Sequence, residues 1–258
     1  YVPLFYLLAP DMRIDGDGSY IFNWDKFDRF IMTFIERGAA KLFEGHHLIH
    51  KRGDWSKGYS GWKFEKDVLG NMVLGWAEPS SDEYREHLIR MLKPLSEHLE
   101  AKGWLHMFIQ HCADEALTEE QLEDAKTVYR IIKEVAPAIK TIDACNKACL
   151  PVFGDLLDIY VPRLDEYGIE KEKFDDLKKA GMELWQYTCC GPQENYLSRL
   201  EDYKLASTRL LHWYSFKCGL SGFLHWAYNL WCFGAIRNNP FDEVCSFMDL
   251  PGDGWIVY

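Results

Sequence analysis

The amino-acid sequence predicts an α/β fold, a (β/α)8 TIM-type barrel that occupies residues 1–258 as one domain. Amphipathic helices alternate with short apolar runs along the whole chain, and a glycine closes most of the helices. Glycine after a helix supplies the left-handed residue that ends it. The apolar runs are continuous, which is typical of parallel strands that are covered on both faces.

Each helix is identified by apolar residues that recur every three or four positions along one face. The third helix has an additional signal, because Thr118-x-x-Gln121 forms a capping box, in which side chain and backbone exchange hydrogen bonds at the helix start. In chain order, helices are expected at 23–37, 81–102 and 118–136, in a short segment that ends at Gly181, and at 202–219.

The apolar runs between these helices are predicted as strands. There are seven of them, at 2–9, 41–47, 104–113, 140–144, 156–161, 182–188 and 222–228. Seven is one strand short of a barrel, so we expect that the first strand precedes Tyr1 and that the chain is a fragment of a longer protein. A doubly wound open sheet is the alternative, but the GxGxxG phosphate-binding motif that accompanies it does not follow any of these strands.

Composition argues against two classes of partner. The net charge is −11, which disfavours binding to nucleic acid or to an anionic membrane surface. No apolar run approaches the roughly 18 to 20 residues that span a bilayer. With 48% hydrophobic residues, a chain of 258 residues can bury one large core.

We expect no cofactor and no metal. The eight cysteines lack the paired C-x-x-C spacing of zinc sites. Cys189 and Cys190 end an apolar strand, so buried free thiols are expected there rather than a strained vicinal disulfide. His46, His47 and His50 could suggest a metal, but they fall in a strand and its exit loop rather than on a helix that would bring the ligands together.

Two adjacent acids, Asp114 and Glu115, follow the predicted strand 104–113. An acid in such a loop often caps the next helix, but that helix begins only at Thr118 and has its own cap. Neighbouring side chains on a strand face opposite ways. At the strand end the backbone turns, so both carboxylates can reach one pocket.

Polar and aromatic residues also stand at the ends of the other predicted strands. In a barrel the carboxyl ends of the strands form the active face. Aromatic rings can cover the C–H face of a sugar while polar groups fix its hydroxyls, whereas an isolated aromatic residue would more simply pack the core. The candidate substrate-binding residues are Glu44, His46, Tyr160, Trp185, Tyr187, Trp226 and Asn229.

Several motifs occur in a specific order after Trp104. They are the acid pair, the segments 157–162 and 185–192, Arg209-x-x-x-Trp213, the segment 222–226, Asn229-x-Trp231 and Gly252-Asp253-Gly254-x-x-x-Tyr258. Together they resemble the catalytic domain of glycoside hydrolase family 123. The resemblance implies a retaining β-N-acetylgalactosaminidase on a barrel, and a preceding β-domain that this chain lacks. Ala116 stands where proline is expected, which should affect the rigidity of the loop more than the chemistry.

The resemblance also implies roles for the two acids and a β-linked GalNAc-containing glycan as the substrate. In substrate-assisted catalysis the 2-acetamido oxygen attacks its own anomeric carbon and forms an oxazolinium ion. Glu115 would be the general acid and later the base, and Asp114 would orient the acetamide. Two close carboxylates should raise the pKa of one and keep Glu115 protonated at the start of the cycle.

The substrate-binding candidates receive narrower roles within this scheme. Trp185 and Trp226 are expected to form the wall for the acetamido methyl group and the sugar platform. Tyr160 is the candidate donor to the acetamide oxygen, while His46 and Asn229, with Glu44, would hold ring hydroxyls.

Two other functions stay open at the level of the sequence. A conventional two-carboxylate glycosidase would pair Glu115 with Glu44 or Asp158, and would hydrolyse sugars that lack the 2-acetamido group. A non-catalytic glycan-binding barrel would bind sugar without turnover.

Overall fold

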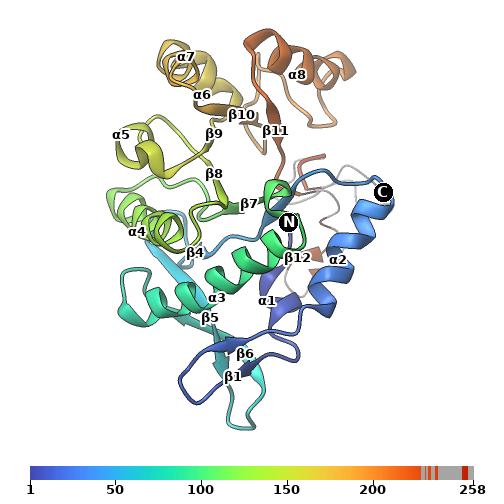
Figure 1. Cartoon of the computed structure of the whole chain (residues 1–258). Coiled ribbons are helices and arrows are strands. Elements are labelled where there is room, and N and C mark those ends of the chain that lie inside the picture. Colours follow the sequence, from blue (N-terminus) through green and yellow to red (C-terminus); the bar gives the residue numbers. More distant parts are fainter. Residues whose placement is uncertain (228–229, 231, 234–235, 238–251, 255–258) are drawn as a thin grey trace. The chain divides into compact units, whose positions relative to one another are not determined.

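The computed structural model describes residues 1–227, 230, 232, 233, 236, 237 and 252–254 (Figure 1). The chain forms two compact units. The first unit comprises Tyr1–Asp143 and Ala148–Asp158, and the second comprises Ala144–Lys147 and Ile159–Tyr258. Each unit is described by itself below.

Three parallel strands lie in the first unit, in the order β3 (Phe43–Gly45), β7 (Phe108–His111) and β8 (Lys140–Ala144). Gly45 pairs with Gln110, and His111 pairs with Ile142, so the carboxyl ends of these strands meet at one edge. The helices of this unit are α1 (Leu4–Leu8), α2 (Asp25–Glu36), α3 (Asp82–Ala101), α4 (Glu119–Val135) and α5 (Leu150–Phe153), with 3-10 turns η1 (Leu105–Met107) and η2 (Gly154–Leu156).

Helices α3 and α4 follow the predicted pattern. The apolar face of α3 is fully buried, with Leu88 and Leu92 at 0% exposure. Burying one leucine side chain contributes about 1.5–3 kcal/mol to the free energy of unfolding. At the start of α4 the Thr118 hydroxyl oxygen accepts a hydrogen bond from the Gln121 backbone N–H at 3.2 Å. In return, the side-chain oxygen of Gln121 accepts one from the Thr118 backbone N–H, also at 3.2 Å. The predicted capping box is therefore confirmed.

The segment of the chain between β3 and α3 forms an antiparallel sheet that was not predicted. It consists of β4 (Ile49–Lys51), β5 (Tyr59–Lys66) and β6 (Met72–Ala77). Its second turn is built by Asp67, whose carboxylate accepts from the backbone of Leu69 and Asn71, and by Gly70 at φ +83°. Two further short strands, β1 (Arg13–Ile14) and β2 (Tyr20–Ile21), form a separate hairpin. We refer to β4–β5–β6 as the insert sheet.

The second unit also has three parallel strands, in the order β9 (Ile159–Val161), β10 (Glu183–Tyr187) and β11 (Gly222–Leu224). The Gln186 side chain donates to the Leu211 carbonyl at 3.3 Å and to the Ser215 hydroxyl at 2.7 Å. This face of β10 is thus covered by α8. The remaining elements are α6 (Leu164–Ile169), α7 (Lys171–Lys179), α8 (Leu205–Cys218), β12 (Cys232–Phe233) and β13 (Ile236–Arg237).

Six of the seven predicted strands are present in the described residues as parallel strands, and the predicted α/β fold is confirmed. The exception is 2–9. Only Val2 pairs with β3, through its N–H to the Glu44 carbonyl at 2.7 Å, and Leu4–Leu8 form helix α1 instead. This run is apolar on all sides, and such short runs do not distinguish strand from helix.

β8 has the predicted bounds, 140–144, and the other five strands are shorter than predicted. The segment 104–113 begins with a 3-10 turn, and 156–161 becomes a strand only at Ile159. No helix among the described residues is long and apolar enough to cross a membrane.

Candidate active site

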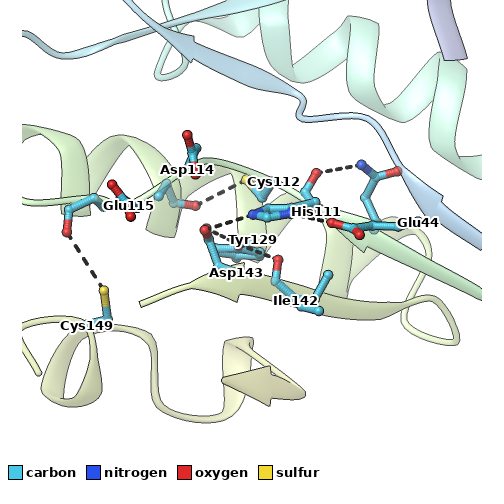
Figure 2. A network of polar contacts seen from close by, with 12 residues as sticks. Glu44, His111, Cys112, Asp114, Glu115, Tyr129, Ile142, Asp143 and Cys149 are labelled. Carbon is cyan, nitrogen blue, oxygen red and sulfur yellow. Dashed lines mark hydrogen bonds and ion pairs between the residues drawn. The ribbon is translucent and has the colours of Figure 1, made fainter. Parts of the chain in front are cut away.

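The acid pair stands immediately beyond β7, at the carboxyl edge of the first unit (Figure 2). Glu115 has φ +48°, a left-handed conformation that costs a non-glycine residue roughly 1–2 kcal/mol. The turn is held from the insert sheet. The Tyr59 hydroxyl donates to the Asp114 carbonyl at 2.8 Å, and the Lys51 ammonium donates to the Glu115 carbonyl at 3.1 Å. The predicted turn of the backbone at these acids is therefore present.

The environment of Asp114 favours its protonated form. Burial is the main cause, and the neighbouring charge of Glu115 adds to it, so that the pKa of Asp114 rises to about 6. The positive charges of His111 and Lys51 oppose this rise. A raised pKa within the pair was expected from the sequence. It falls on Asp114, the residue expected to orient the acetamide.

A buried charged network lies beneath the pair. His111 is 1% exposed, and its two ring nitrogens each meet a carboxylate: Nδ1 lies 2.5 Å from Glu44 Oε1, and Nε2 lies 3.1 Å from Asp143 Oδ1 (Figure 2). The Tyr129 hydroxyl donates to the other oxygen of Asp143 at 2.5 Å. Burial alone lowers the pKa of His111, but the hydrogen bonds to Asp143 and Glu44 outweigh it and raise the pKa to about 10. His111 is therefore an imidazolium at neutral pH.

One group of residues has the close spacing of metal ligands. A nitrogen of His47, a nitrogen of His111 and a carboxylate oxygen of Asp114 lie within 4.8 Å of one another. The group does not fit a metal ion, because both nitrogens of His111 are engaged with carboxylates and carry protons. A metal ligand must be a neutral imidazole with a lone pair.

Glu44 and His46 lie in the first unit. The Oε1 atom of Glu44 is engaged with His111, a partner that the sequence did not predict for this carboxylate. The His46 Nδ1 atom lies 3.1 Å from the carbonyl oxygen of His47. The His46 ring is tilted against that of His50, with 4.9 Å between the ring centroids.

Four of the predicted aromatic residues lie in the second unit. Trp185 donates to Glu183 at 3.0 Å and covers Gly222 on the neighbouring strand, and Trp226 donates to Asp253 at 3.0 Å. Tyr187, at the end of β10, is on the same face of the strand as Trp185 and is 8% exposed. Asn229 lies outside the described residues.

Tyr160 is fully buried and sits on the opposite face of this sheet from Trp185. It pairs with Leu184, which shares its face of β10 with Gln186, and Gln186 contacts α8. Side chains of paired residues in a parallel ladder point to the same side. The Tyr160 side chain therefore points toward the helix-covered face.

The sequence suggested that Asp158 stands at the carboxyl end of a strand, but it does not. It precedes β9, and its carboxylate accepts from the Lys133 ammonium at 2.5 Å and from the Thr141 N–H at 2.7 Å. Thr141 is near the start of β8, whereas the acid pair follows the end of the parallel strand β7. Asp158 is therefore at the opposite edge of the first unit from Glu115.

Sequence reasoning missed several residues around the acids. His111 was detectable, since a histidine in a buried apolar strand, three residues before an acid pair, needs a partner. Lys51 and Tyr59 were not, because they belong to the insert sheet. Lys51 is additionally fixed by the Trp55 ring, whose centroid lies 3.4 Å from the ammonium nitrogen.

The chain matches the family model "Glycoside hydrolase 123, catalytic domain" over residues 10–258. A solved family 123 glycoside hydrolase from Clostridium perfringens, described in a study of glycolipid glycan hydrolysis, is 20% identical, with a TM-score of 0.70. The comparison covers 96% of this chain and 42% of that one, so this chain spans about two fifths of that protein's length.

Two other solved structures are less similar. An endo-1,4-β-xylanase from Caldicellulosiruptor owensensis is 14% identical, with 87% of this chain and 76% of that one covered and a TM-score of 0.45. Aspergillus fumigatus Ega3, in complex with galactosamine, is 12% identical, with 75% and 78% covered and a TM-score of 0.41. None of the curated proteins matches the chain.

The family model covers nearly the whole chain, and the Clostridium perfringens structure shares its fold. The chain therefore belongs to glycoside hydrolase family 123 and carries the catalytic domain of that family.

Proposed function

We propose that this domain is a retaining exo-β-N-acetylgalactosaminidase that uses the 2-acetamido group of its substrate as the nucleophile. The observation that carries the proposal is the placement of Asp114 and Glu115 on one tight turn. Consecutive acids on a single turn approach the sugar from one side. This suits an acid and an acetamide-orienting group better than two carboxylates on opposite sides of the scissile bond.

Glu115 begins the cycle as the general acid. It donates its proton to the glycosidic oxygen while the acetamide oxygen attacks the anomeric carbon, so the C–O bond to the leaving group breaks as the oxazolinium ring closes. Asp114 accepts a hydrogen bond from the acetamide N–H and stabilises the positive charge that develops on it. Glu115 then removes a proton from water, which attacks the anomeric carbon. The bond between that carbon and the acetamide oxygen breaks, so the acetamide is regenerated and the original β configuration is restored. Intramolecular attack also avoids the entropic cost of bringing in a separate nucleophile.

The surroundings of the pair disfavour a conventional two-carboxylate mechanism. Glu44, one candidate nucleophile, is engaged with His111. Asp158, the other, is engaged with Lys133 and Thr141 at the far edge of the parallel strands. For the sugar itself we propose Trp185, Tyr187 and Trp226 as aromatic contacts, with His46 and Asn229 as hydroxyl ligands.

Three p-nitrophenyl glycosides test this function: β-GalNAc, β-GlcNAc and β-galactoside. We expect turnover of β-GalNAc above β-GlcNAc, no significant turnover of the β-galactoside, and a β-configured first product by proton NMR. A thiazoline analogue of the oxazolinium ion derived from GalNAc should inhibit competitively. Comparable turnover of the β-galactoside would contradict acetamide participation.

The raised pKa of Asp114 predicts a pH dependence. Asp114 must be ionised to accept from the acetamide N–H, so kcat/KM should increase as the pH rises through about 6. Asp114→Asn cannot ionise, and this limb should disappear from the residual activity of that variant. A pH profile with an unchanged acid limb in Asp114→Asn would assign the limb to another group.

A further inference from the structure

A small aromatic cleft lies in the first unit, and only one of its lining residues, His46, has a role in the function proposed above. It has a volume of about 220 Å³ and lies between helix α1, the insert sheet and the link from β3 to β4. Its walls include Phe5, His46, His50, Trp62, Leu74 and Trp76. Pockets for drug-sized ligands measure roughly 300–1,000 Å³. This cleft is therefore suited to a ligand the size of a single ring.

The lining of the cleft is uncharged. Burial lowers the pKa of His50 to about 4 and also lowers that of His46, so both rings are neutral at physiological pH. None of the residues that line it is an acid, a lysine or an arginine. A neutral imidazole can donate and accept hydrogen bonds, which suits hydroxyl groups rather than a phosphate or a carboxylate.

One wall of the cleft offers an accessible aromatic face. Trp76 is 51% exposed although it is a large apolar residue, and its ring centroid lies 5.9 Å from that of His50. Trp62, by contrast, is buried, and its indole N–H is already bonded to the His47 carbonyl at 2.7 Å. An exposed indole beside neutral hydrogen-bonding groups matches the two-sided character of a pyranose, which has an apolar C–H face and hydroxyls at its edge.

The cleft shares His46 with the segment that follows β3, at the carboxyl end of that strand. His46 directly follows β3, whose Glu44 contacts His111, and His111 ends β7 just before the acids. The Tyr1 ring lies between His46, which lines the cleft, and His111, which ends β7. Its centroid is 6.2 Å from that of His46 and 6.3 Å from that of His111. A substrate that places its GalNAc at Asp114 and Glu115 can therefore extend toward the cleft.

We propose that this cleft binds the sugar ring to which GalNAc is attached, an uncharged pyranose on the leaving-group side of the scissile bond. The inference rests on the proposed function and adds its preference for the leaving group. Trp76 supplies the stacking face, and His50 supplies a hydrogen bond to a hydroxyl. The insert sheet thereby makes the enzyme selective for glycans over simple alkyl glycosides.

The test compares two substrates with alkyl alcohol leaving groups, methyl β-GalNAc and a disaccharide in which GalNAc is β-linked to a neutral hexose. For Trp76→Ala we expect kcat/KM on the disaccharide to fall about tenfold, the usual loss for one good aromatic contact. The methyl glycoside should be hydrolysed at the wild-type rate. His50→Phe, which keeps an aromatic ring, should give a smaller loss with the same selectivity.

Val73→Ala provides a matched control, because Val73 is on β6 with Trp76 but on the opposite face of the strand. It should leave both substrates unaffected. Equal loss on the two substrates in Trp76→Ala, or no loss on either, would overturn the assignment of the cleft while the proposed function stands. Failure of the wild-type enzyme on both substrates would instead overturn the proposed function and this inference with it.

Discussion

Glu115→Gln is expected to lower kcat by about 10²–10⁴-fold on a glycoside with a poor leaving group, since the glutamine cannot donate the proton that the departing oxygen needs. On an activated aryl glycoside the leaving group needs little protonation, and the loss of kcat should be much smaller. Single-turnover rates on a methyl and a 2,4-dinitrophenyl glycoside of GalNAc measure this difference, because they isolate the step in which the glycosidic bond breaks.

Asp114→Asn is the matched control for this experiment. It removes one charge from the same turn, yet it should slow both substrates to a similar extent, because acetamide participation is needed whatever the leaving group. Identical leaving-group dependence in the two variants would show that our division of roles between the two acids is wrong.

Replacing His111 is expected to give the largest loss of stability. His111→Phe leaves the carboxylates of Glu44 and Asp143 near each other without the positive charge between them. Removing one member of a buried ion pair costs about 3–5 kcal/mol. Urea denaturation at pH 7, followed by tryptophan fluorescence, measures the free energy of unfolding. Tyr129→Phe keeps the charges and removes one hydrogen bond to the Asp143 carboxylate, so it should cost less, about 1.5–3 kcal/mol.

The same network predicts the direction of the pH dependence of stability. The pKa of His111 in the folded protein is about 10, above the roughly 6.5 of an unfolded histidine. Its contribution is therefore complete below about pH 6.5 and is lost as the pH rises through 10. In His111→Phe the free energy of unfolding should therefore fall less between about pH 6.5 and pH 10 than it does in the wild type. An equal fall in the two proteins would show that the imidazolium is not the source of this pH dependence.

The sequence was most informative where local chemistry determines the structure. The capping box at Thr118 and the glycine that ends α8 depend on a few neighbouring residues, and both are present. The acid pair was found because two carboxylates after a buried strand have no structural reason to be there. Family resemblance then supplied the roles that a pattern alone does not contain.

The parts that were missed depend on contacts distant in sequence. The insert sheet sets the turn at Asp114 through Tyr59, which is 55 residues earlier in the chain. The role of Glu44 depends on His111, which is 67 residues away. For Tyr160 the sequence indicated a strand but not which face would meet the helices, and a shift of one residue reverses the answer.

The burial of His111 bears on the surroundings in which the enzyme can work. Dissolved ions screen charges at the protein surface within about 8–10 Å, but they screen buried charges much less. The electrostatic effect of His111 on the pKa of Asp114 is therefore set by the fold and depends little on ionic strength. A surface lysine in the same role would have tied the ionisation of Asp114 to ionic strength, whereas the buried imidazolium makes its part of that ionisation nearly independent of salt.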